Sequence, residues 1–200
     1  MDIIELKNKA KDTLKDHYKD SFIITLIVII LSLITSLLNR YIENSAIKVT
    51  ISIITTFIET FFTLGTTSFY LKLARGEDTS YKELFAHKDL LITGVLISLI
   101  IAIFVFLWGL LLIVPGIIAA ISYSYALYIF IDNNDIEIMD AINKSKEMMM
   151  GHKKDFFFLI ISFLGWLILS LLSFGILLLY VTPYINMTIT LFYEEIKEAK

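Results

Sequence analysis

Trp108-Gly-Leu-Leu-Leu-Ile-Val-Pro115-Gly116-Ile-Ile118 lies inside an uncharged run that extends from Leu90 to Ile131. As one straight helix at about 1.5 Å per residue, this run would be roughly twice as long as the approximately 30 Å hydrocarbon core of a bilayer. The chain must therefore turn back within the run. Pro115 lacks a backbone donor and Gly116 accepts a positive φ, so we expect a tight turn here between transmembrane helices 90–114 and 116–131.

A second uncharged run, from Phe156 to Tyr193, has the same design. Its length again exceeds one span, and a glycine again lies near its middle. We therefore expect transmembrane helices over 156–173 and 175–192, with Phe174-Gly175 as the turn between them.

Two earlier apolar segments, 21–38 and 46–71, are each long enough for one further span. With 57% hydrophobic residues, the chain is too apolar for a soluble domain of its length. The sequence thus predicts an all-α, polytopic membrane protein that forms a single domain over 1–200. Six transmembrane helices are expected, arranged as three hairpins.

Short amphipathic helices are expected before the first, third and fifth spans. In 1–20, apolar residues recur every three or four positions, which is typical of a helix lying on a membrane surface. Each segment also contains two residues at the capping-box spacing of a helix start. These pairs are Asp2 with Glu5, Ser80 with Glu83, and Asn134 with Glu137.

The distribution of basic residues predicts the orientation of the chain. Of the 17 Lys and Arg, all except Arg40 and Lys48 lie in the termini or in the two long polar connectors. Because cytoplasmic loops carry an excess of Lys and Arg, both termini and both connectors are expected to be cytoplasmic.

His17, His87 and His152 occupy similar positions, each directly before an odd-numbered span. Two explanations of this similarity remain open: a threefold internal repeat of surface helix plus hairpin, or the shared preferences of side chains at a membrane interface. The three histidines and Lys153 are candidates for contact with lipid headgroups. No metal site is expected, because nothing in the sequence makes the histidines converge.

Glu59 is the intramembrane residue that most requires an explanation, because a charge at the bilayer centre costs about 2.5 to 3.5 kcal/mol on insertion scales. It lies in a stripe of polar residues with helical spacing, and the fourth and sixth spans carry polar residues of their own. Stripes that face one another would line a cavity, whereas hydrogen bonds between packed helices would explain the same pattern without a ligand. The candidate residues are Glu59, Thr56, Thr63, Asn186 and Tyr125.

Several segments spread over nearly the whole chain carry a family resemblance, and these are 70–77, Leu107-Trp108, Ile113–Ile118, 122–125, 141–153, 162–166, 183–186 and 192–195. In these segments the chain resembles the bacterial integral-membrane family of domain-of-unknown-function 975. The resemblance implies a location in the bacterial plasma membrane and no known activity.

No feature of the sequence predicts catalysis. The chain has no cysteine, no HExxH or GxSxG motif and no phosphate-binding GxxxxGK[ST] loop. We therefore expect a non-enzymatic protein without cofactors that binds or moves a lipid-like or amphipathic molecule, or interacts with another membrane protein. Its partners would be membrane lipids and not nucleic acid. The alternatives are a structural or assembly factor of the plasma membrane and an intramembrane enzyme that uses Glu59.

Overall fold

The computed structural model describes residues 2–42 and 44–198, and in these residues it contains helices and no strands. The all-α prediction is thereby confirmed. The ten α-helices of the described chain are α1 (Ile3–Lys15), α2 (Tyr18–Tyr41), α3 (Ser45–Ala74), α4 (Leu91–Leu111), α5 (Ile113–Tyr123), α6 (Ala126–Asp132), α7 (Ile138–Met148), α8 (Lys153–Ile161), α9 (Leu164–Leu172) and α10 (Leu178–Glu198). Two short 3-10 helices, η1 (Tyr81–Phe85) and η2 (Lys88–Leu90), precede α4.

Five helical segments are long and apolar enough to cross a membrane. Their outward faces carry large apolar side chains, which suits contact with lipid rather than with water. The sixth expected span, 175–192, corresponds largely to α10, which is not among the five. The five segments are Tyr18–Leu38, Ser45–Ala74, Tyr81–Leu111, Ile113–Asp132 and Lys153–Leu172.

The turn expected at Pro115-Gly116 lies three residues earlier, at Leu112. Leu112 is extended, with φ −161° and ψ 150°, and separates α4 from α5. Pro115 falls in the first turn of α5, where a missing backbone donor costs little. A Cβ at Gly116 would lie 2.9 Å from the Cα of Gly109, so the glycine allows α4 and α5 to approach closely instead of forming the turn.

The expected helix 116–131 is interrupted, because α5 ends at Tyr123 and α6 begins at Ala126. Ser145 of α7 satisfies the backbone at this break. Its hydroxyl accepts a hydrogen bond from the amide of Tyr125 (3.1 Å) and donates one to the carbonyl of Ser122 (2.9 Å). A fully buried side chain therefore replaces hydrogen bonds that a continuous helix would have made itself.

The expected helix 156–173 is divided into α8 and α9 at Ser162 and Phe163. Lys7 donates from Nζ to the carbonyl of Ser162 (3.1 Å) and to its hydroxyl (3.0 Å). A turn then follows at the expected place, because Phe174 (φ 53°) and Gly175 (φ 85°) both adopt left-handed conformations.

Of the three expected capping boxes, one cap forms. The carboxylate of Asp2 accepts from the amides of Ile4 (2.8 Å) and Glu5 (3.5 Å) at the start of α1. Ser80 and Glu137 occupy the N-cap positions of η1 and α7 without a side-chain cap bond. The carboxylate of Glu83 instead reaches α3, where the hydroxyl of Ser68 (2.7 Å) and Nζ of Lys72 (2.9 Å) donate to it.

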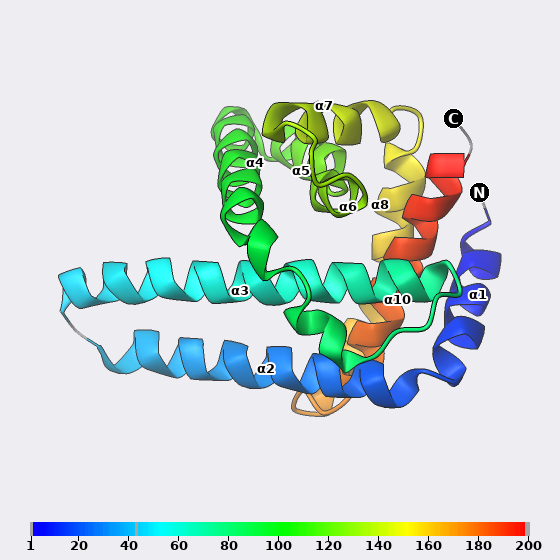
Figure 1. The fold of residues 1–200 in the computed structure, drawn as a ribbon, viewed down its shortest axis with the longest axis horizontal. Helices are drawn as coiled ribbons and strands as arrows, with labels where there is room; N and C mark the ends of the chain where they lie inside the picture. The colour runs from blue at the N-terminus through cyan, green and yellow to red at the C-terminus, as the bar shows by residue number, and fades with distance from the viewer. Residues whose placement is uncertain (1, 43, 199–200) are drawn as a thin grey trace.

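The segments that precede the odd-numbered spans pack on protein. The apolar face of α1, formed by Leu6, Ala10 and Leu14, is buried, and α1 packs against α10, beside which it lies in Figure 1. In the same way η1 packs against α3 and α7 against α6. The apolar face of α1 thus contacts protein, because α10 covers it, and the location of 1–20 at a membrane surface stays a prediction.

The helices group into three units, each made of a pre-span segment and the two helical arms that follow it (Figure 1). The first unit is α1 to α3, the second is η1 to α6 and the third is α7 to α10. The contacts between the units follow a cyclic order, in which the third unit precedes the first. Each pre-span segment packs on the second arm of the preceding unit, and α2, α4 and α8 contact the same arms. The three histidines also share a backbone conformation, with φ of −113° at His17, −107° at His87 and −105° at His152. This order favours an internal repeat as the origin of the similar histidine contexts.

Candidate binding cavity

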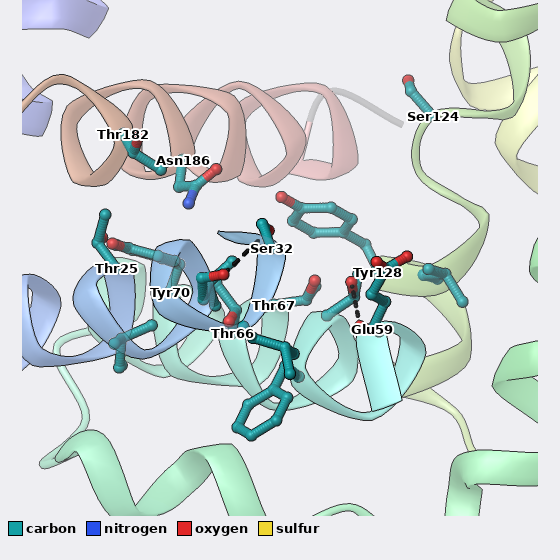
Figure 2. A pocket seen from close by; sticks show the side chains of 16 residues that line it. Thr25, Ser32, Glu59, Thr66, Thr67, Tyr70, Ser124, Tyr128, Thr182 and Asn186 are labelled. Atoms are coloured by element: carbon teal, nitrogen blue, oxygen red, sulfur yellow. Dashed lines mark hydrogen bonds between the residues drawn. The ribbon is translucent and has the colours of Figure 1, made fainter. Parts of the chain in front are cut away.

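A cavity of about 460 Å³ lies between α2, α3, α6 and α10, with Ser124 of the α5–α6 link also in its wall. We call it the main cavity; Figure 2 shows its lining side chains. Its walls combine apolar residues with many hydroxyl groups, so it suits a molecule that is part apolar and part polar. The polar lining residues are Thr25, Ser32, Glu59, Thr63, Thr66, Thr67, Tyr70, Ser124, Tyr128, Thr182 and Asn186.

Four of these hydroxyl groups, those of Thr25, Ser32, Thr63 and Ser124, donate to a backbone carbonyl three or four residues earlier. Thr25 donates to the carbonyl of Ser21 (2.9 Å), and Ser32 donates to that of Val28 (3.0 Å). Back-bonding of this kind satisfies a hydroxyl group in an apolar environment without a partner from another helix. These side chains therefore explain little about a ligand.

Tyr70 and Thr66 differ, because their buried hydroxyl oxygens make no hydrogen bond of good geometry among the described residues, although the side chains of Ser21, Thr25 and Asn186 lie close to the Tyr70 hydroxyl group. Both side chains line the main cavity, and Tyr70 is only 1% exposed. An unpaired buried hydroxyl group costs about 1 to 3 kcal/mol. The cavity thus presents two polar groups that a bound molecule could satisfy.

Glu59 and Asn186 lie at the same cavity, on α3 and α10 respectively. In Figure 2, Glu59 lies at the end of the cavity beside Tyr128. Glu59 is exposed, whereas Asn186 is half-buried. Among the described residues, no side chain or backbone amide hydrogen-bonds to the Glu59 carboxyl group, so this group is open to a ligand or to the surroundings of the chain.

The other sequence-predicted polar residues are distributed differently. Thr63 lines the main cavity and donates to the carbonyl of Glu59 (2.8 Å). Thr56 is exposed and lies outside the lining. Tyr125 is fully buried beside α10, where its hydroxyl donates to the carbonyl of Ile189 (3.0 Å). The structure therefore brings together Glu59, Thr63 and Asn186, and places Thr56 and Tyr125 elsewhere.

An ionic cluster joins the ends of α3 and α6 to α10. Nη2 of Arg75 lies 2.7 Å from Oδ1 of Asp132 and 2.7 Å from Oε1 of Glu194. Tyr193 donates to Oδ2 of Asp132 (2.7 Å), and Lys197 pairs with the same oxygen. Burial opposes the charge of the Arg75 guanidinium, but its hydrogen bonds to Glu194 and Asp132 outweigh this and raise its pKa.

Sequence reasoning missed this cluster, because its residues come from the ends of three separate elements. A usable signal was nevertheless present: Asp132 is the first charged residue after the uncharged run 90–131, and Arg75 follows the apolar segment 46–71 shortly after Lys72. They hold the ends of α3, α6 and α10 together on one side of the main cavity's helices. We refer to Arg75, Asp132, Tyr193, Glu194 and Lys197 as the ionic cluster.

The interfacial candidates lie at helix starts. His17, His87 and His152 are the N-cap residues of α2, η2 and α8, and Lys153 begins α8. Nε2 of His87 is 3.3 Å from Oε1 of Glu83. Within residues 2–42 and 44–198, no three histidine, aspartate or glutamate side chains form a group suited to a metal ion.

Comparison with known families places the chain in a family. The chain matches the model of a family described as "Protein of unknown function (DUF975)" over residues 1–126 and 110–200. Neither the curated proteins nor the solved structures yield a match. The two matched segments extend over the whole chain, in agreement with the resemblance seen in the sequence, and the chain therefore belongs to the DUF975 family.

Proposed function

We propose that this protein is a multi-pass protein of the bacterial plasma membrane that binds a lipid-like or amphipathic molecule in the main cavity. The observation that carries the proposal is the unpaired, buried hydroxyl group of Tyr70 in the wall of a cavity that is otherwise largely apolar. A hydrocarbon chain would contact the apolar wall, and a polar group of the same molecule would bond to Tyr70.

The polar group of the proposed ligand is not expected to be an anion. Among the described lining residues, Glu59 is the only one that carries a carboxylate, and none is a lysine, arginine or histidine. Hydroxyl and amide groups dominate the remaining polar surface. This composition favours a neutral or hydroxyl-bearing polar group over an anionic one.

A binding role is also favoured over catalysis. The three histidines lie at helix starts outside the described lining of the cavity, so Glu59 has no histidine beside it to act as an acid. A general acid–base pair requires both groups within hydrogen-bonding reach of the same substrate. The enzyme hypothesis based on Glu59 therefore has less support than binding.

We further propose six crossings in three hairpins, with α10 as the sixth. α1, α2 and α3 pack around α10 and bury many of its side chains. A span surrounded by protein does not need the apolar surface of a lipid-facing helix, which accounts for its absence from the five apolar segments. Six crossings place both termini on the cytoplasmic side, as the distribution of Lys and Arg predicts.

Single-cysteine labelling tests this topology, because the sequence contains no cysteine. Phe174 and Leu112 lie at hairpin turns and are 98% and 68% exposed, and Met150 lies in the connector before α8 and is 61% exposed. A membrane-impermeant maleimide should label Phe174→Cys and Leu112→Cys in whole cells, and Met150→Cys only in inverted vesicles. Labelling of all three from the same side would contradict the hairpins.

Ligand binding is tested by native mass spectrometry of the protein released from native membranes. The wild-type protein should carry one bound amphipathic molecule. Ser32→Phe, which projects a ring from α2 into the main cavity, should lose it. Ser36→Phe is the matched control one turn later on the same helix, where the side chain lies outside the described lining. Equal retention by both variants would overturn the proposal.

A further inference from the structure

A second, smaller pocket of about 250 Å³ lies where α1 and the start of α2 meet α10. Two lysines and three tyrosines surround it, together with one leucine. We call it the lysine–tyrosine pocket. Its lining residues are Lys11, Leu14, Lys15, Tyr18, Tyr180 and Tyr184. It shares no residue with the lining of the main cavity.

The two lysines of this pocket lack an acidic partner. Lys7, Lys11 and Lys15 follow one another at intervals of four residues and therefore lie on one face of α1. Among residues 2–42 and 44–198, no carboxylate forms an ion pair with any of the three. Like charges at this spacing repel one another, so an anion between them would be stabilising.

Lys7 has a separate, structural role. Its ammonium group binds Ser162 and lies 4.0 Å from the centroid of the Phe163 ring. Burial and the neighbouring charge of Lys11 lower the pKa of Lys7. Lys11 and Lys15 are exposed, and Lys11 lies 5.3 Å from the centroid of the Tyr184 ring. These two ammonium groups therefore remain available to a ligand.

The tyrosine side of the pocket supplies a hydrogen-bond donor. The hydroxyl oxygen of Tyr18 is buried and has no partner within the described part of the chain. Its ring packs against Tyr180, with centroids 5.5 Å apart, and Tyr180 in turn lies 6.1 Å from Trp166. Tyrosine and tryptophan rings combine apolar faces with polar tips, and therefore suit a molecule that has both apolar and polar parts.

We propose that Lys11, Lys15 and the hydroxyl group of Tyr18 bind the phosphate of an anionic phospholipid headgroup. Two ammonium groups neutralise the phosphate, and the phenol donates a hydrogen bond to one of its oxygens. Tyr180 and Trp166 lie beside the position where the glycerol and the first carbons of the acyl chains would follow. This site requires that the chain resides in a membrane, but it does not depend on a ligand in the main cavity.

The test uses the full chain in nanodiscs that contain a mixture of phosphatidylglycerol and phosphatidylcholine. Native mass spectrometry then measures how strongly phosphatidylglycerol is retained over phosphatidylcholine. Lys11→Gln and Lys15→Gln should each lower the retention about fivefold, the ratio that corresponds to about 1 kcal/mol per basic residue near an anionic surface. Tyr18→Phe should lower it as well, because the ring remains and the donor is lost.

Lys19→Gln is the matched control, since it removes an exposed lysine from the start of α2 outside the described lining of the pocket. Its retention of phosphatidylglycerol should equal that of the wild-type protein. An equal loss in Lys19→Gln and Lys11→Gln would mean general attraction between charges and would overturn the site. If millimolar inorganic phosphate displaced the lipid, the site would bind a soluble phosphate, and the proposal of a phospholipid headgroup would be overturned.

Ser32→Phe separates this proposal from ligand binding in the main cavity. The substitution blocks the main cavity and leaves the lysine–tyrosine pocket intact. It should therefore retain phosphatidylglycerol like the wild-type protein. A loss of phosphatidylglycerol in Ser32→Phe comparable to that in Lys11→Gln would contradict a separate headgroup site.

Discussion

Arg75 and Asp132, which are 57 residues apart in the sequence, form an ion pair of 2.7 Å between the ends of α3 and α6. Arg75 directly follows α3, and Asp132 is the last residue of α6. Glu194 and Tyr193 connect the pair to α10. The second arms of the three units, which end in α3, α6 and α10, therefore meet at the ionic cluster.

Arg75→Met should lower the free energy of unfolding by about 2 kcal/mol. Removal of one partner from a buried ion pair costs about 3 to 5 kcal/mol, and the exposed part of the Arg75 side chain reduces this figure. Unfolding in mixed micelles measures the loss. Arg40→Met is the control, because Arg40 is exposed at the end of α2. Equal stability of the two variants would show that the cluster does not hold the helices together.

Ser145→Ala should destabilise the protein by about 1 to 3 kcal/mol, because the amide of Tyr125 and the carbonyl of Ser122 would lose their common partner in the protein interior. Unfolding in mixed micelles again measures the loss in the free energy of unfolding. Ser36→Ala removes an exposed hydroxyl group from α2 and should leave stability nearly unchanged. A loss no larger than that of Ser36→Ala would mean that the break between α5 and α6 does not need Ser145.

Gly65→Ala should destabilise the contact between α3 and η1. A Cβ at Gly65 would lie 2.5 Å from the Cα of Leu84, so backbone would have to move, at a cost of about 1 to 3 kcal/mol. At Gly109 nothing lies within 4 Å of an added Cβ, so Gly109→Ala should keep or increase the thermal stability. A Gly65→Ala variant as stable as the Gly109→Ala variant would refute close packing of η1 on α3.

The helical character of the chain and its five apolar segments were predictable because they depend on local properties. Uncharged length and hydropathy are sufficient to identify a span, and the turn at Phe174-Gly175 follows from a glycine between two apolar runs. The cap formed by Asp2 is likewise a local interaction.

The structure differs from the sequence prediction at residues whose roles depend on partners far away in the sequence. Gly116 packs on Gly109 instead of forming the turn, and Glu83 bonds to Ser68 and Lys72 instead of capping its own helix. The break between α5 and α6 likewise requires Ser145 from another helix. Spacing along one helix gives no information on such contacts. For the candidate site, the polar stripes contained Glu59, Tyr70 and Asn186, whereas the burial of the Tyr70 hydroxyl group depends on the packing of four helical segments.

Glu59 provides a test of the polar end of the main cavity. Glu59→Gln keeps a group that can donate and accept hydrogen bonds, whereas Glu59→Leu keeps neither function. Both variants should fold, because the side chain is exposed. Occupancy of the cavity by the co-purified molecule, measured by native mass spectrometry, should persist in Glu59→Gln and fall several-fold in Glu59→Leu. Equal occupancy in both would remove Glu59 from the binding site.

The most direct measurement is an experimental structure of the protein in lipid nanodiscs, with a bound antibody fragment to aid alignment. Binding of an amphipathic molecule predicts elongated density in the main cavity between α2, α3 and α10, with a polar group within hydrogen-bonding distance of the Tyr70 hydroxyl. A cavity closed by its own side chains, with the Tyr70 hydroxyl bonded to Asn186 and no bound molecule, would contradict it.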